Sequence, residues 1–176
     1  MDANNFKPGT EPDGFRGIKW GTDISYLSGI HHCRTDSDSE YSNIEIYEKE
    51  NDEMRIGGAA LKRIEYCFWQ GKFYSIQVYA QGKQDIEYLK EAVFEKFGDG
   101  GHEDKYFKLG AILRWNGTIT EMYLQGHRYL FDRNSSNFGM ISVEIKKLKT
   151  AYEEKQKDLE RIEREKLAKE GAEQGF

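Results

Sequence analysis

The sequence has few cysteines and prolines, and this scarcity limits the classes of protein it fits. Among 176 residues there are only two cysteines, Cys33 and Cys67, and two prolines. Two cysteines are too few for a disulfide scaffold, and their separation does not match a metal-binding pair. We expect no bridge between them, because a polar loop and a sheet interior should hold their Cα atoms more than about 7 Å apart.

Long apolar runs and an excess of positive charge are also missing. No apolar run approaches the roughly 18 residues that span a bilayer, so we expect no membrane span. The net charge is −5 at pH 7, whereas nucleic-acid-binding proteins usually present a basic face. We therefore expect no nucleic-acid partner. The first residues, MDANN, do not form the apolar segment of a signal peptide.

The sequence does contain enough large apolar side chains for a core. It has 11 tyrosines and 10 phenylalanines, and 38% of its residues are hydrophobic, which argues against global disorder. The length fits one domain with appendages. Composition divides the chain into a disordered leader (1–14), an α+β domain (15–145) and a charged helical tail (146–176). Order is expected to begin at Phe15, because the leader holds both prolines and little that could pack.

The pattern of apolar, polar and turn-forming residues predicts the first elements of the domain. Residues 15–22 are typical of a short strand ending in a glycine turn, after which Thr22 or Asp23 can cap one helical turn. The polar stretch 31–43 predicts a loop. Residues 44–47 alternate and predict a strand.

The clearest hairpin lies in the middle of the chain. Residues 60–69 and 73–80 both alternate, and Gly71 lies between them. A three-residue loop at 70–72 keeps the apolar side chains on one face, whereas a slip of one residue would swap the faces. That register pairs three residues of the first strand with three of the second: Ile64 with Val78, Tyr66 with Ile76, and Phe68 with Tyr74.

The period then changes to that of a helix. Apolar residues at helical spacing predict a helix over 85–97, with Gly98 at the favoured left-handed position after its end. Asn116-Gly117 between alternating runs predicts a two-residue hairpin turn. That hairpin gathers four apolar side chains on one face: Leu113, Trp115, Met122 and Leu124.

These elements define a fold class. Strands joined by hairpins form antiparallel sheet, helices cover one face of such a sheet, and residues 138–145 close it. We predict an α+β fold in which an antiparallel sheet of about six strands is backed by a central helix, with a charged C-terminal helix. A continuation of the sheet over 127–133 is also expected.

The tail is predicted to be a helix because it is rich in oppositely charged residues four positions apart, such as Glu160 and Arg164. We expect Leu148 and Tyr152 to anchor it to the domain, and the rest to project into solvent. The thin apolar seam of the projecting part makes three residues candidates for binding a partner: Leu159, Ile162 and Leu167.

One cluster contains metal-ligand residue types. His31-His32-Cys33 precedes Asp36, Asp38 and Glu40. The spacing does not match a calcium-binding EF-hand loop, and zinc usually requires four convergent ligands. We interpret the cluster as a solvated polar loop and expect neither a metal nor a cofactor. Cys67 is interpreted as a small core residue rather than a nucleophile.

Aromatic residues supply the candidate ligand site. Trp69, Phe73 and Tyr79 lie off the main apolar stripes of their strands. Exposed together, they could stack against a sugar, a peptide or a base. The alternative is that they form a second layer beneath a helix or the tail.

Four segments carry a resemblance to a known family. They are FRGIKWGTDIS (15–25), FWQGKFYSI (68–76), LKEAVFEKFG (89–98) and LRWNGTITEMYL (113–124), followed by FGMISV (138–143). In this order they resemble a family of small uncharacterised bacterial proteins, typically exported to the periplasm or cell envelope. The resemblance covers about 15–145, and it carries over no catalytic residue because its motifs are turns and core aromatics. It implies the periplasm or envelope if a native signal was trimmed, and otherwise the cytoplasm.

Two functional hypotheses remain open. The first is a binding or structural module of the envelope that engages an unknown protein or small ligand. The second is a small hydrolase-like enzyme whose site the sequence does not identify. Convergent histidine, cysteine or acidic groups in one pocket would favour the enzyme. A flat exposed aromatic face would favour binding.

Overall fold

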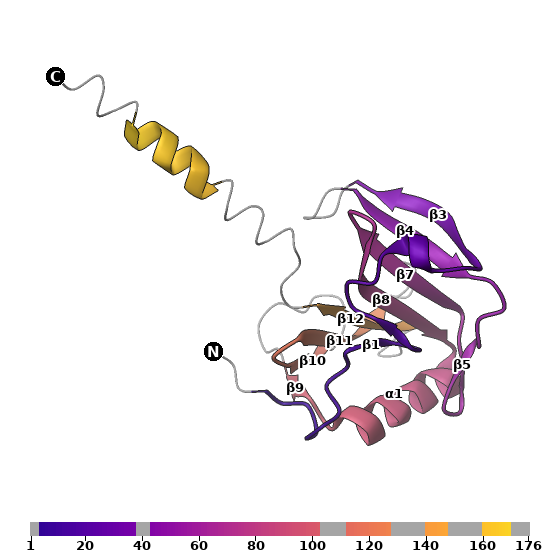
Figure 1. The fold of residues 1–176 in the computed structure, drawn as a ribbon. Helices are drawn as coiled ribbons and strands as arrows, with labels where there is room; N and C mark the ends of the chain where they lie inside the picture. Colours follow the sequence, from indigo (N-terminus) through magenta and orange to yellow (C-terminus); the bar gives the residue numbers. More distant parts are fainter. Residues whose placement is uncertain (1–3, 38–42, 103–111, 128–139, 148–159, 170–176) are drawn as a thin grey trace.

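The fold is built around one large antiparallel sheet. The computed structural model describes residues 4–37, 43–102, 112–127, 140–147 and 160–169. In these residues the main sheet has eight strands in the order β3-β4-β7-β8-β12-β11-β10-β9 (Figure 1). Their bounds are β3 (Ile30–Asp36), β4 (Ile44–Lys49), β7 (Arg63–Trp69), β8 (Lys72–Gln81), β9 (Gly101–His102), β10 (Ile112–Asn116), β11 (Thr120–His127) and β12 (Met140–Lys147). The predicted α+β class with an antiparallel sheet is confirmed, while the count of about six strands was too low.

Smaller elements border this sheet. Two hairpins of two-residue strands are formed by β1 (Gly14–Phe15) with β2 (Ile18–Lys19) and by β5 (Arg55–Ile56) with β6 (Ala59–Ala60). The short helix η1 (Ile24–Tyr26) starts where the sequence predicted. The Asp23 side chain accepts a hydrogen bond from the backbone N–H of Ser25 at 2.9 Å and so caps it.

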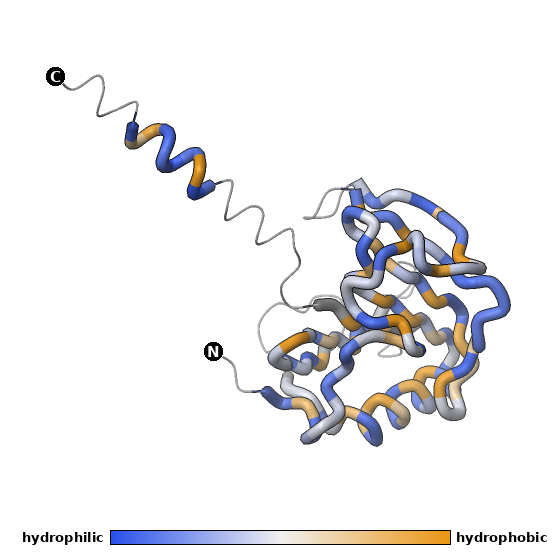
Figure 2. The backbone as a smooth tube through the Cα atoms, viewed as in Figure 1, coloured by the Kyte–Doolittle hydropathy of each residue, from blue (hydrophilic) through white to orange (hydrophobic). Residues whose placement is uncertain are grey.

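Helix α1 (Lys83–Phe97) covers one face of the sheet, called here the helix-covered face. The predicted apolar stripe is buried in full: Ile86, Leu89, Val93 and Phe97. Gly98 has a φ of 85° and donates its N–H to the Phe94 carbonyl at 2.9 Å, so the predicted glycine stop is confirmed. In Figure 2, hydrophobic residues recur along α1 and the neighbouring strands.

The β7–β8 hairpin follows the predicted register only in part. Ile64 lies opposite Val78 and Tyr66 opposite Ile76, as predicted. The expected pairing of Phe68 with Tyr74 is wrong, because Phe68 lies opposite Phe73. Gln70 and Gly71 both have positive φ, so two residues close the turn. A β-bulge after Cys67 absorbs the extra residue.

The second hairpin also corrects a prediction. Asn116 pairs with Glu121, so residues 117–119 connect β10 to β11, and the predicted two-residue turn at Asn116-Gly117 is wrong. The predicted apolar group nevertheless forms, since Trp115 pairs with Met122 and Leu113 with Leu124. Glu11 binds the backbone where this loop enters β11. The carboxylate accepts the N–H groups of Ile119 and, at 2.9 Å, Thr120.

Residues 4–14 pack against the domain. The sequence had predicted that they belong to a disordered leader and that order begins at Phe15. Phe6 is only 7% exposed, and its ring packs in a T-shaped contact with that of Phe97, at 5.9 Å between centroids. The N–H of Asn5 donates to the Asn116 carbonyl at 3.1 Å. These partners lie about a hundred positions away in the chain, so local composition could not reveal them.

Strand β3 corrects the loop predicted over 31–43. It pairs with β4 along the outer edge of the sheet, and most of its residues are exposed. An edge strand with solvent on both sides needs no apolar alternation, which explains why the pattern was missed. Residues 38–42 lie outside the described part of the chain.

The tail is helical over residues 160–169, and every residue of this helix is exposed. The expected anchor at Leu148 and Tyr152 lies outside the described residues, as does the predicted strand beyond His127. Within the described chain, no helix has the length and apolar content that crossing a bilayer requires.

Candidate functional site

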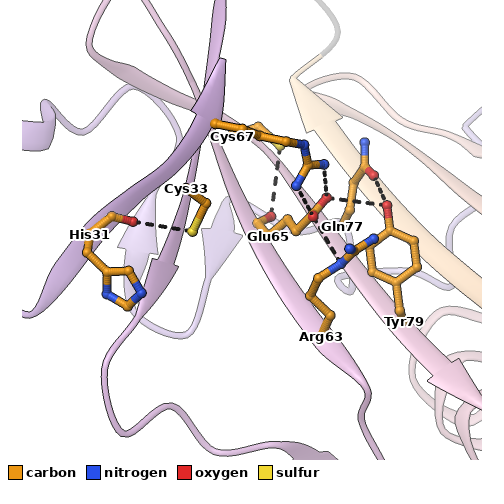
Figure 3. A network of polar contacts seen from close by, with 8 residues as sticks. His31, Cys33, Arg63, Glu65, Cys67, Gln77 and Tyr79 are labelled. Atoms are coloured by element: carbon orange, nitrogen blue, oxygen red, sulfur yellow. Dashed lines mark hydrogen bonds and ion pairs between the residues drawn. The ribbon is translucent and has the colours of Figure 1, made fainter. Parts of the chain in front are cut away.

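The face of the sheet opposite α1, called here the polar face, is organised around a buried carboxylate. Glu65 of β7 is 1% exposed. Arg34 of β3 donates to both carboxylate oxygens, at 2.6 and 3.0 Å, in the bidentate geometry typical of strong arginine pairs. Arg63 places its Nε 2.9 Å from the same group. Figure 3 shows the Arg63 side chain beside Glu65.

Tyr79 and Gln77 of β8 complete this network. The Tyr79 hydroxyl donates to the Gln77 side chain and lies 3.4 Å from Glu65. The Arg63 guanidinium lies over the Tyr79 ring at 4.4 Å. Burial, and then the Glu65 charge, raises the pKa of Tyr79 to about 12, so the phenol stays protonated at neutral pH. Because both carboxylate oxygens are already bonded, we assign the network to fixing β3, β7 and β8 in register.

The three aromatic candidates do not form a stacking platform. Phe73 is 0% exposed on the helix-covered face, where its ring lies 4.9 Å from that of Trp20. Trp69 and Tyr79 are 5% and 8% exposed and lie on the polar face. The expectation that they share one exposed surface is therefore wrong. The bulge in the hairpin sends Phe73 to the other side, a shift that alternation alone could not show.

Three potential metal ligands meet at the sheet edge beside the polar network. His31, Cys33 and Glu48 place their ligand atoms within 4.8 Å of one another. His31 and Glu48 face each other across β3 and β4, and a bulge brings in Cys33. Burial, and then the Glu48 charge, raises the pKa of the Cys33 thiol. A nucleophilic cysteine requires the opposite shift. Cys33 and Cys67 are both free thiols, as predicted.

A cavity of about 430 Å³ lies between α1, the sheet and the two small hairpins. Its floor is apolar and deeply buried, with side chains from β8, α1 and β12: Val78, Leu89, Val93, Phe97, Val143 and Ile145. This volume falls within the roughly 300–1,000 Å³ range of small-molecule sites. No sequence motif pointed to it, because its walls come from distant segments.

The rim of the cavity carries more positive than negative charge. Arg16, Arg55, Lys96 and Glu53 line it. Arg16 is held by an ion pair with Asp52 and donates to the Arg55 carbonyl at 3.0 Å. Arg55 and Lys96 have no carboxylate partner within the described part of the chain. The rim can therefore attract an anionic group.

Asp52 links this rim to the core. Its second carboxylate oxygen accepts the Tyr66 hydroxyl at 2.8 Å. Burial and this hydrogen bond raise the pKa of Tyr66, so Tyr66 remains a donor and fixes Asp52. Asp52 in turn fixes Arg16, and the rim is therefore preorganised.

The tail candidates are exposed where the structure describes them. Ile162 is 56% and Leu167 63% exposed, while Leu159 lies outside the described residues. Their role in partner binding stays a prediction. Comparisons of the chain with protein-family models, curated proteins and solved structures gave no match.

Proposed function

We propose that this protein is a binding module whose cavity takes a small amphipathic molecule with an anionic head. The observation that carries the proposal is the cavity of about 430 Å³ with an apolar floor and a cationic rim. Ligand sites typically combine mostly apolar walls with a few placed polar groups. A medium-chain fatty acid has this chemistry.

The cavity offers basic residues for the head of such a ligand and apolar residues for its tail. Lys96 is exposed at the C-terminal end of α1, and Arg55 lies in the β5–β6 hairpin. A carboxylate between them would gain charge-assisted hydrogen bonds, while the chain would lie on Val93 and Val143. Each buried methylene contributes about 0.8 kcal/mol, so affinity should rise roughly fourfold per carbon until the cavity is full.

The composition of the cavity favours binding over hydrolysis. Serine, threonine, cysteine and histidine are missing from the described residues that line it. A hydrolase of the usual kind needs a nucleophile next to a base. The hydrolase-like alternative gains no support from this cavity.

The compartment is part of the same proposal. The resemblance to exported bacterial proteins supports the periplasm or cell envelope. Fusing the native gene start to a reporter that is active only outside the cytoplasm tests this. An inactive reporter would favour the cytoplasmic alternative.

Binding is tested by calorimetric titration of the full chain with hexanoate, octanoate and decanoate. We expect affinity to rise along the series and the neutral decanol to bind more weakly than decanoate. Ala92→Phe places a ring in the cavity wall and should abolish binding. Glu91→Phe, at the adjacent exposed position, is the matched control and should bind normally.

The head contact has its own control on the same helix. Lys96→Gln should reduce the preference for decanoate over decanol. Lys90→Gln should not, since Lys90 pairs with Glu87 and lies outside the cavity lining. Equal binding of decanoate by wild type and Ala92→Phe would contradict the proposal.

A further inference from the structure

The edge of the sheet carries a second potential site, made of residues that do not line the cavity. His31, Cys33 and Glu48 offer one nitrogen, one sulfur and one oxygen ligand. They come from β3 and β4, and they share no residue with the cavity. The inference below therefore does not depend on the proposed ligand of the cavity.

The backbone holds these ligands on the same side. His31 lies directly opposite Glu48 in the antiparallel pair, where opposed Cβ atoms are only about 4.5–5.5 Å apart. The bulge inserts Cys33 between His32 and Arg34. Cys33 thus lies beside His31 (Figure 3), while Arg34 still donates to Glu65.

The local charges suit a cation. Arg34, the nearest arginine along the strand, is bound by both oxygens of Glu65, so its charge is largely offset. Glu48 is half-buried, and its carboxylate lies within 4.8 Å of the Cys33 sulfur. His31 and Cys33 are exposed on an edge strand, so an ion can reach them from solvent.

We propose that His31, Cys33 and Glu48 bind one Zn²⁺ ion, with water as the fourth ligand. Tetrahedral zinc bonds of about 2.0–2.3 Å bring ligand atoms to roughly 3.5 Å apart, and the present spacing is within 4.8 Å. Only small side-chain rotations are required. On binding, the thiol releases its proton to solvent and its S–H contact with the His31 carbonyl is lost.

The donor set selects the kind of metal. Calcium and magnesium prefer sites made of oxygen ligands, whereas zinc accepts thiolate and imidazole together with carboxylate. Three protein ligands leave one exchangeable position, unlike the closed four-ligand sites of structural zinc. The site is therefore assigned to reversible zinc binding rather than to holding the fold together.

The test uses the untagged full chain, titrated with Zn²⁺ in calorimetry and with Co²⁺ in absorption spectroscopy. We expect one ion per chain, a tetrahedral cobalt spectrum with a thiolate charge-transfer band, and no binding of Mg²⁺. Cys33→Ser should remove that band. His31→Ala should weaken zinc at least about tenfold, as loss of even an outer-shell partner often does.

His32→Ala is the matched control for His31→Ala. The His32 ring lies on the helix-covered side, in a T-shaped contact with Tyr47 at 5.2 Å between centroids, so zinc affinity should not change. Bound zinc should also protect Cys33 from alkylation. Cys67 is buried, so its reactivity should be low with or without zinc. The proposal is overturned if wild type binds no zinc, or if zinc binds His31→Ala and Cys33→Ser as tightly as wild type.

Discussion

The two faces of the sheet carry alternate residues of the same strands, but they surround their buried side chains with different groups. On the helix-covered face, Tyr66 and Ile76 are buried among apolar side chains beneath α1. On the polar face, Glu65 is equally buried, but two arginines and a tyrosine surround it. The first face gains stability from apolar area. On the second face, the Glu65 network offsets the cost of desolvating a carboxylate through ion pairs, and this network should therefore contribute less.

The largest expected effect is on the helix-covered face. Phe73→Ala should lower the free energy of unfolding by about 3–5 kcal/mol, as large-to-small changes of buried phenylalanine do. Chemical denaturation monitored by circular dichroism measures the loss. If the variant does not fold, Phe73→Leu should show a smaller loss. Tyr26→Ala, at an 83% exposed residue, is the control and should stay within about 0.5 kcal/mol.

A smaller loss is expected on the polar face. Glu65→Gln keeps the shape of the side chain but leaves Arg34 and Arg63 without their anion. We expect a cost of about 1–3 kcal/mol, typical of hydrogen bonds to charged groups. Both arginine side chains are more than 40% exposed. Water can therefore hydrate their guanidinium groups in the variant, which limits the loss.

The control for that change is an exposed pair on α1. Glu87→Gln removes the partner of Lys90, and Glu87 is 56% exposed, so its cost should stay below about 1 kcal/mol. Denaturation curves for both variants give the comparison. A Glu65→Gln loss as large as that of Phe73→Ala would contradict the expectation that the Glu65 network contributes less than apolar packing on the helix-covered face.

The stability contributed by Glu11, which binds the backbone at the start of β11, should depend on pH. Burial raises the pKa of Glu11, but hydrogen bonds from the backbone of Ile119, Thr120 and Thr118 outweigh it, so the pKa lies below its ordinary 4.5. Since the folded pKa is lowered, the stabilisation is present above pH 4.5 and is lost as pH falls through the folded value. Glu11→Gln should cost about 1 kcal/mol at pH 7, by analogy with helix caps.

The pH series for this variant distinguishes charge from shape. Thermal melts of wild type and Glu11→Gln should converge as the pH falls below 4.5. A constant difference at all pH values would mean that Glu11 acts through packing and not through its charge.

The smallest effect is expected outside both faces. Deleting residues 160–176 removes an exposed helix and should change the stability of the monomer by less than about 0.5 kcal/mol. The melting midpoint should therefore move by no more than about 2 °C. A drop of more than about 4 °C would place the tail within the core and remove Ile162 and Leu167 as partner-binding candidates.

Local patterns were sufficient where the partner of a residue lies nearby in sequence. The stripe of α1 and its stop at Gly98 follow from the helical period and from the left-handed φ that glycine tolerates. The strands β7 and β8 follow from alternation. The pairing of Ile64 with Val78 follows from keeping one face apolar.

The candidate sites could not be predicted from local sequence patterns. The cavity is lined by residues from Pro12 to Ile145, and the edge site needs Glu48 opposite His31. His31 and Cys33 stand out in the sequence, but their strand is polar on both sides, so its pattern predicts a loop. The third ligand came from the neighbouring strand, where no spacing rule points.

The sequence by itself therefore determined helix α1, the existence of the β7–β8 and β10–β11 hairpins and most of their core-facing side chains, since these depend on periods of two or three to four residues. Tertiary structure decided how the segments meet. It paired β8 with β12, bound the backbone of Ile119 and Thr120 to Glu11, and buried Phe6 against Phe97. These contacts join residues tens to a hundred positions apart, so their energies depend on the whole fold and leave no local pattern.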